Sequence, residues 1–266
     1  MTVIQSLLLG VLQGVAEFMP ISSSGHLVLL RRLMDLGAIP LLYDVLLHVS
    51  TLIVVVIVFR SRIGSILSSI WRALKAASGA EDRENLRLTL YILIATAVTG
   101  TVGFLLSRLE DVFFNRPRLV SLLFLVTALF LLSTLVRRGR RDYLQIGFLG
   151  AVIVGLAQGI GVLPGISRAG ITISASLLLG LDRQRAGEFS FLIAVPAILG
   201  ALLLQLREAA ALLELVEPVA LLVGFAASFL VGLVSLLLLL KIIRSGQLAL
   251  FSIYLVPLAV ISFILL

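Results

Sequence analysis

The chain has no cysteine among its 266 residues and only two histidines, His26 and His48. Without cysteine there can be no disulfide, no thiolate metal site and no cysteine nucleophile. Any bound metal ion would therefore need oxygen or imidazole ligands.

Charged residues are also scarce, at 13% of the chain, whereas 60% of the residues are hydrophobic. Soluble domains average about 25% charged and 45–50% apolar residues. This composition predicts an integral membrane protein. Long unbroken apolar runs recur and the short alternating segments of a barrel do not, so the predicted type is helical.

The formal net charge of +7 would suggest a nucleic-acid partner in a soluble protein. Here Lys and Arg gather mostly in short stretches between apolar segments, where they set membrane orientation, so we expect no nucleic-acid partner. The first apolar segment lacks a basic start and a small-residue cleavage site. We therefore expect it to be retained rather than removed as a signal peptide.

Two polar breaks interrupt the apolar sequence, at Pro20–His26 and at Pro164–Thr172. The apolar segments around each break are barely long enough or too short to span a membrane, which takes about 20 residues. Irregular backbone at membrane depth is tolerated only where it is buried in protein or lines a cavity. We therefore predict two re-entrant helical hairpins, over residues 2–36 and 144–181.

Three full spans are predicted after each hairpin. They cover about 43–60, 87–107, 118–137, 186–206, 218–241 and 247–266. The stretch between the first two spans, to about residue 86, is predicted to be a polar loop. The expected fold is an all-α polytopic membrane protein with six transmembrane helices and two re-entrant hairpins in one membrane domain.

The two halves, 1–141 and 142–266, resemble each other. Gly10–Gly14 aligns with Gly155–Gly159, and Ser22 with Ser167, at the same offset of 145 residues. Chance similarity between apolar helices is the alternative. Each half crosses the membrane an odd number of times, which predicts an inverted-topology repeat whose broken segments meet around a binding site.

Basic residues set the expected orientation. They concentrate in the stretches 60–87, 137–141, 183–185 and 241–244, which the positive-inside rule places in the cytoplasm. Both termini would then face outward, and the first hairpin would enter the membrane from outside.

Glu17 lies deep in the first apolar segment, four residues after Gln13 and on the same helix face. An ionisable residue at this depth is costly and is a functional candidate by default. Oxygens of both side chains suit a hard cation such as Mg²⁺ or Ca²⁺. The alternative is a protonated Glu17 that hydrogen-bonds a neighbouring helix.

The first break contains Ser22, Ser23, Ser24, Gly25 and His26. Serine is a preferred N-cap, and we expect at least one of the three to act as one. A helix N-terminus also suits a phosphate, and Gly25 permits close backbone approach. A serine with a nearby base is a candidate nucleophile. His26 is a candidate nucleophile, general base or general acid, with simple packing as its alternative.

Arg168 is the only arginine in the second break. Its planar fork suits phosphate oxygens, and Ser167, Gly170 and Thr172 beside it are predicted to help bind the substrate. A structural arginine here would need a carboxylate partner, for which Glu17 is the obvious candidate. The two roles are compatible.

Two further pairs carry less weight. Asp44 and His48, at the head of a span, either line the cavity mouth or face the surface. Glu188 and Ser190 fit ordinary interface residues.

These motifs resemble the undecaprenyl pyrophosphate phosphatase family of the bacitracin-resistance type. Gln13-Gly-Val-Ala-Glu17 fits its (E/Q)xxxE motif, and Pro20–His26 fits its Pro-x-Ser-Ser-x-Gly-His stretch. Pro164–Thr172 fits its Pro-Gly-x-Ser-Arg-Ser-x-x-Thr motif, except that Ala169 replaces the usual second serine. The resemblance covers the whole chain in length and span order.

The resemblance implies hydrolysis of undecaprenyl diphosphate to undecaprenyl phosphate and inorganic phosphate, which recycles the lipid carrier for peptidoglycan synthesis and confers bacitracin resistance. It also implies Mg²⁺ or Ca²⁺ and a site open to the outer face of the bacterial inner membrane. The expected nucleophile is Ser23, His26 or a water that His26 activates. A polyprenyl-phosphate transporter or flippase is the rival hypothesis, because inverted repeats with broken helices are typical of transporters. The sequence leaves a homodimer open.

Overall fold

The fold comes from a computed structural model, which describes residues 1–36, 39–107, 112–113, 116–135 and 139–265. Every named element within these residues is a helix. The described residues also contain one isolated β-bridge, between Arg141 and Leu181. The predicted all-α class is therefore confirmed.

The two halves contain the following helices. In the first half they are α1 (Val3–Phe18), α2 (Ser23–Leu33), α3 (Leu41–Val58), α4 (Arg60–Leu74), the 3₁₀ turn η1 (Ala80–Asp82), α5 (Arg83–Ser107) and α7 (Pro117–Ser133). In the second half they are η2 (Tyr143–Gln145), α8 (Gly147–Ile160), α9 (Arg168–Leu178), α10 (Arg183–Gln205), η3 (Leu206–Glu208), α11 (Ala209–Leu215), α12 (Pro218–Ser245), η4 (Leu248–Leu250) and α13 (Phe251–Leu265).

Five helical stretches in the described residues are long and apolar enough to cross a membrane. They are Leu41–Val58, Ala80–Leu106, Arg183–Gln205, Pro218–Ser245 and Leu248–Leu265. They coincide with five of the six predicted spans. The sixth, 118–137, corresponds to α7, which has 17 residues, so this span stays a prediction. Its end, and Arg137 and Arg138 of the basic run, lie outside the described residues.

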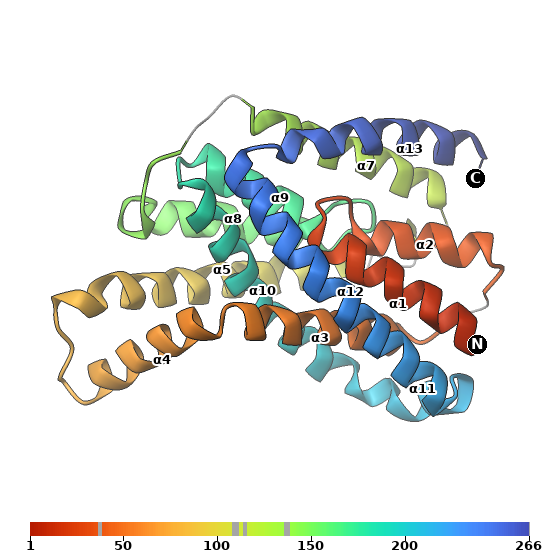
Figure 1. Cartoon of the computed structure of the whole chain (residues 1–266), viewed down its shortest axis with the longest axis horizontal. Coiled ribbons are helices and arrows are strands. Elements are labelled where there is room, and N and C mark those ends of the chain that lie inside the picture. The colour runs from red at the N-terminus through yellow and green to blue at the C-terminus, as the bar shows by residue number, and fades with distance from the viewer. Residues whose placement is uncertain (37–38, 108–111, 114–115, 136–138, 266) are drawn as a thin grey trace.

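The stretch from residue 60 to 86 was predicted to be a polar loop, and this is wrong. Residues 60–74 form α4, which continues outward from α3, and α5 runs back beside it, so that the two helices extend together at one end of the molecule (Figure 1). Ile66 and Ser69 are buried, and Ile63 and Ile70 pack against the same core. Apolar residues recur here at helical spacing, at Ile63, Ile66 and Ile70, but the arginines and serines between them have the composition of a polar loop.

The repeated glycines allow close helix packing in both halves. α1 lies along α12 (Figure 1), and its counterpart α8 lies along α5. A Cβ atom at Gly10 would overlap the carbonyl oxygen of Gly224, and one at Gly155 would lie 2.8 Å from the carbonyl oxygen of Ala95. Small residues let membrane helices approach to this distance. The aligned glycines therefore serve the same purpose in each half.

Both helix breaks lie inside the protein. Pro20, Ser22, Pro164 and Gly165 are buried, and Ile166 belongs to the main hydrophobic core. This agrees with the expectation that irregular backbone at membrane depth is shielded from lipid.

Candidate active site

The two breaks touch through Ser22. Its hydroxyl accepts a hydrogen bond from Gly25 N (3.3 Å), which caps α2, and a second from Gly165 N in the other break (3.0 Å). A Cβ atom on Gly25 would lie 2.8 Å from Gly165 N and from the Phe124 ring. Ser22 itself has φ of 73°, an uncommon conformation for a residue with a side chain. The prediction that the breaks meet is confirmed.

The second break is held by a residue that the sequence reading did not single out. Thr127 of α7 donates a hydrogen bond to Gly165 O (2.9 Å) and accepts one from Ser167 N (3.0 Å). Ser167 caps α9 by accepting a hydrogen bond from Gly170 N (3.1 Å). These contacts fix the backbone from which Arg168 projects.

Glu17 is the centre of the polar cluster. It lies in the last turn of α1, and its side chain is 4% exposed. Its Oε2 accepts hydrogen bonds from Ser23 Oγ (2.8 Å) and from Gln13 Nε2 (3.1 Å). Its Oε1 pairs with the Arg168 guanidinium. The predicted ion pair between the two halves is therefore present.

Ser23 and Arg168 lie 145 residues apart, which is the offset that aligns the two halves of the sequence. Each is the first residue of its helix, α2 or α9, and each contacts the same carboxylate. The site therefore joins a hydroxyl, a carboxylate and a guanidinium across the junction of the two breaks.

His48 is part of this cluster, although the sequence pattern left its role open between the cavity mouth and the surface. Its Nδ1 lies 2.9 Å from Glu17 Oε2 and 2.8 Å from Gln13 Nε2. Its position four residues after Asp44 was the available signal. Asp44 is buried and pairs with Arg31 at 2.5 Å, next to the cluster.

His26 points away from Glu17. Its Nδ1 lies 2.8 Å from Ser22 O, and its Nε2 lies 2.8 Å from the hydroxyl of Tyr254 on α13. The Tyr254 ring stacks on it with centroids 5.7 Å apart. The Nδ1 geometry fits a proton donated to the carbonyl, which leaves Nε2 to accept from Tyr254. Among the contacts of the described residues, none joins His26 to Glu17 or Ser23.

The remaining predicted binding residues mostly serve the local structure. The N–H groups of Gly25 and Gly170 are taken by the capping serines. Thr172 Oγ1 donates to Arg168 O (2.7 Å) and lies 2.5 Å from Ser190 Oγ. Ser24 is half-buried in the first turn of α2. A role for these groups in substrate binding stays a prediction.

The donor set suits a hard cation only in part. The described residues contain no group of three His, Cys, Asp or Glu side chains that would hold a metal ion. Gln13 Oε1 is buried without a hydrogen-bond partner, and it lies on the side chain that contacts Glu17. Mg²⁺ commonly uses one or two protein oxygens together with phosphate oxygens and water. Gln13 and Glu17 fit this pattern.

Fold and site together define a helical membrane protein with a buried acid–hydroxyl–arginine cluster at the junction of two helix breaks. The chain belongs to the family described as bacitracin resistance protein BacA, whose model matches residues 6–261.

Relatives match along nearly the whole chain. The chain is 45% identical over 261 residues to undecaprenyl-diphosphatase of Treponema denticola, with 97% of this chain and 95% of that protein covered. It is 38% identical over 254 residues to the protein of that name from Carboxydothermus hydrogenoformans, covering 94% and 92%. The protein of that name from Korarchaeum cryptofilum is 40% identical over 266 residues, covering 98% and 99%.

Proposed function

We propose that the chain is a membrane phosphatase that hydrolyses undecaprenyl diphosphate to undecaprenyl phosphate and inorganic phosphate. The family and the names of its full-length relatives support this activity. The observation that carries it is the contact of Glu17 with both Ser23 and Arg168. A carboxylate, a hydroxyl and a guanidinium in one cluster provide a base, a nucleophile and a phosphate-binding cation.

The proposed topology has six spans and two re-entrant hairpins in an inverted repeat, with first repeat 1–141 and second repeat 142–266. Same-offset contacts support the repeat. Gln13 of α1 contacts His48 of α3, and Gln158 of α8 donates to Ile193 O of α10 (3.1 Å). Both residues of the second pair lie 145 positions after those of the first. A contact that recurs at the same offset favours a repeat over chance similarity between apolar helices.

Arg168 is the proposed phosphate-binding group. Its side chain is 19% exposed, against 4% for Glu17, so it is the partner that solvent or substrate reaches more easily. A diphosphate would share or displace its contact with Glu17, which frees the carboxylate. The lipid tail would lie between spans, in the bilayer.

Ser23 is the proposed nucleophile, with Glu17 as its base. The carboxylate already accepts the Ser23 hydroxyl proton in a 2.8 Å hydrogen bond, within the reach that general-base catalysis needs. Ser23 Oγ would bond to the terminal phosphorus as the bridging P–O bond breaks, releasing undecaprenyl phosphate. Water would then hydrolyse the phosphoserine and release inorganic phosphate. His26 contacts Ser22 and Tyr254 instead, which favours a positioning role.

A divalent cation, Mg²⁺ or Ca²⁺, is proposed as cofactor, held by Glu17 and Gln13. When bound it would neutralise phosphate charge. Chelator-treated protein should lose activity and regain it on addition of either ion. Unchanged activity after complete chelation would contradict this part of the proposal.

The proposed location is the bacterial inner membrane, with the site open to its outer side. There the reaction would recycle the lipid carrier for peptidoglycan synthesis and give resistance to bacitracin, as the family description implies. Two copies of the chain would form the homodimer that the sequence leaves open. Cross-linking in native membranes would test that state.

Phosphate release by purified protein in detergent tests the activity and separates it from transport. Ser23→Ala should lower kcat roughly a thousandfold or more, and Arg168→Gln should lower it roughly 100- to 1000-fold. Ser262→Ala is the matched control, because Ser262 is a buried serine that contacts Ser121 far from the cluster. Wild-type protein that stays folded and releases no phosphate would instead support a polyprenyl-phosphate transporter.

A further inference from the structure

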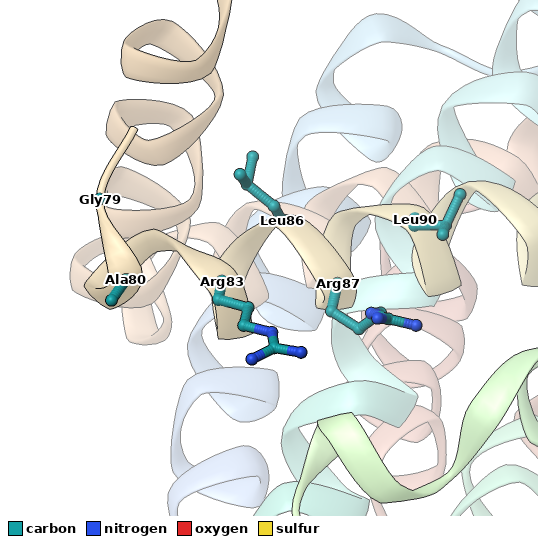
Figure 2. Close-up of a pocket in the computed structure, with 6 residues that line it drawn as sticks. All are labelled: Gly79, Ala80, Arg83, Leu86, Arg87 and Leu90. Carbon is teal, nitrogen blue, oxygen red and sulfur yellow. The ribbon is translucent and has the colours of Figure 1, made fainter. Parts of the chain in front are cut away.

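A second polar site lies at the start of α5, on a different part of the molecule. Gly79, Ala80, Arg83, Leu86, Arg87 and Leu90 line an open hollow of about 440 Å³. Figure 2 shows Arg83 and Arg87 extending from the same side of α5, one helical turn apart. Their guanidinium groups can therefore contact one ligand.

Both arginines are free to bind such a ligand. Among the described residues, no ion pair or hydrogen bond engages the side chain of Arg83 or Arg87. In the part of the chain that the structure describes, none of the neighbouring acids Glu81, Asp82 and Glu84 forms an ion pair with either arginine. Asp82 pairs with Arg72 of α4, and Glu84 lies 3.4 Å from Arg62. The hollow therefore keeps a net positive charge.

The length of α5 favours a position of this hollow near the lipid headgroups. Its 25 residues extend roughly 37 Å at the usual helical rise, whereas the hydrocarbon core of a bilayer is about 30 Å thick. The apolar part of the helix leads to its C-terminal end, so the excess falls in the first turns. Exposed Trp71 of α4, with Lys75 Nζ 4.5 Å from its ring centroid, marks an interface at the same end of the molecule.

An apolar stripe continues from the hollow along α5. Leu90 and Leu93 lie on one helix face and are each about half exposed or more. At Gly100, on the same face, a Cβ atom would meet nothing within 4 Å. The stripe is therefore an exposed apolar surface that begins beside Arg83 and Arg87.

We propose that this surface binds an anionic phospholipid of the bilayer. Its phosphate would lie between Arg83 and Arg87, whose planar forks match phosphate oxygens, and an acyl chain would follow the stripe. Basic side chains at a membrane surface attract anionic lipids in the same way. The site is separate from the Glu17 cluster and does not depend on the proposed hydrolysis.

Native mass spectrometry of the full-length protein in detergent tests the proposal. Phosphatidylglycerol and zwitterionic phosphatidylcholine of equal chain length are added in turn, and the bound fractions are compared. Wild-type protein should prefer phosphatidylglycerol. Each basic side chain contributes roughly a fivefold preference, so we expect Arg83→Gln with Arg87→Gln to lower the ratio roughly twentyfold.

The matched control replaces two other exposed arginines, Arg32→Gln with Arg207→Gln, and removes the same net charge. It should leave the preference for phosphatidylglycerol unchanged. Leu93→Ser should weaken the binding of both lipids without changing the ratio of their bound fractions. Melting temperatures of all variants, measured in the same detergent, establish that each is folded.

Three results would overturn the assignment. The double variant of Arg83 and Arg87 and its control variant could lower the ratio of bound phosphatidylglycerol to phosphatidylcholine equally, which would indicate a general charge effect. The ratio could also stay at the wild-type value in the Arg83 and Arg87 variant. Finally, the hollow could retain undecaprenyl phosphate with no preference for phosphatidylglycerol, which would assign it to the product of the proposed reaction.

Discussion

The ion pair between Glu17 and Arg168 should couple the two halves of the chain energetically. Glu17 is almost fully buried and Arg168 is mostly buried. Removing one partner of a buried pair leaves an unpaired charge, at a cost of about 3–5 kcal/mol. We expect Arg168→Gln to lie near the lower limit, because Ser23 and Gln13 still donate hydrogen bonds to the carboxylate and His48 Nδ1 lies 2.9 Å from it.

Glu17→Gln should cost less than Arg168→Gln. The freed guanidinium is the more exposed partner and can turn toward water, so we expect a loss of about 1.5–3 kcal/mol, the usual value of a hydrogen bond to a charged group. The double variant leaves no unpaired charge. Its loss should fall short of the sum of the single losses by about 1–3 kcal/mol.

Unfolding in mixed detergent micelles, followed by far-ultraviolet circular dichroism, measures all four free energies. Arg32→Gln serves as the surface control and should stay within about 0.5 kcal/mol of wild type. If the losses from the two single variants add to within about 0.5 kcal/mol in the double variant, the two residues do not interact. That result would refute the site as described.

Two further predictions concern packing and positioning. Gly10→Ala should destabilise the protein by about 1–3 kcal/mol or more, because the new methyl group overlaps the Gly224 carbonyl. At Gly100 the space is open, so Gly100→Ala should be neutral or should stabilise the protein by up to about 1 kcal/mol. The same unfolding assay compares them. Tyr254→Phe keeps the stacked ring but removes the hydroxyl that donates to His26. It should lower the free energy of unfolding by about 1–3 kcal/mol. An unchanged free energy of unfolding would contradict this hydrogen bond.

The helix breaks were predictable because they depend on local chemistry. Proline, serine and glycine inside an apolar run end one helix and cap the next, whatever surrounds them. The structure places the helix starts at Ser23 and Arg168. The amphipathic α4 was missed for the opposite reason. Its arginines and serines have the composition of a loop, and it becomes stable by packing its apolar face on α5 and the core.

The central ion pair was predictable because a buried charge needs a partner and the chain offers few. Arg168 was the only cation in either break, so electrostatics selected it. Thr127 and Tyr254 had no such signal. Each contacts a break from a distant helix, and an ordinary threonine or tyrosine in an apolar helix does not reveal which face it presents.

The offset of 145 residues that aligns the two halves of the sequence pairs residues of the two breaks, and the differences between these residues create the chemistry. The counterpart of Ser23 is Arg168, the counterpart of Glu17 is Val162, and the counterpart of His48 is Ile193. Two identical breaks would bring together either two carboxylates or two guanidinium groups, and like charges repel strongly in a buried site. Here one half supplies the acid and the hydroxyl, and the other supplies the cation. Val162 is exposed whereas Glu17 is buried, so the two aligned positions also differ in their surroundings. Divergence of the halves is therefore a requirement of the site, because its charges balance only when the two breaks differ.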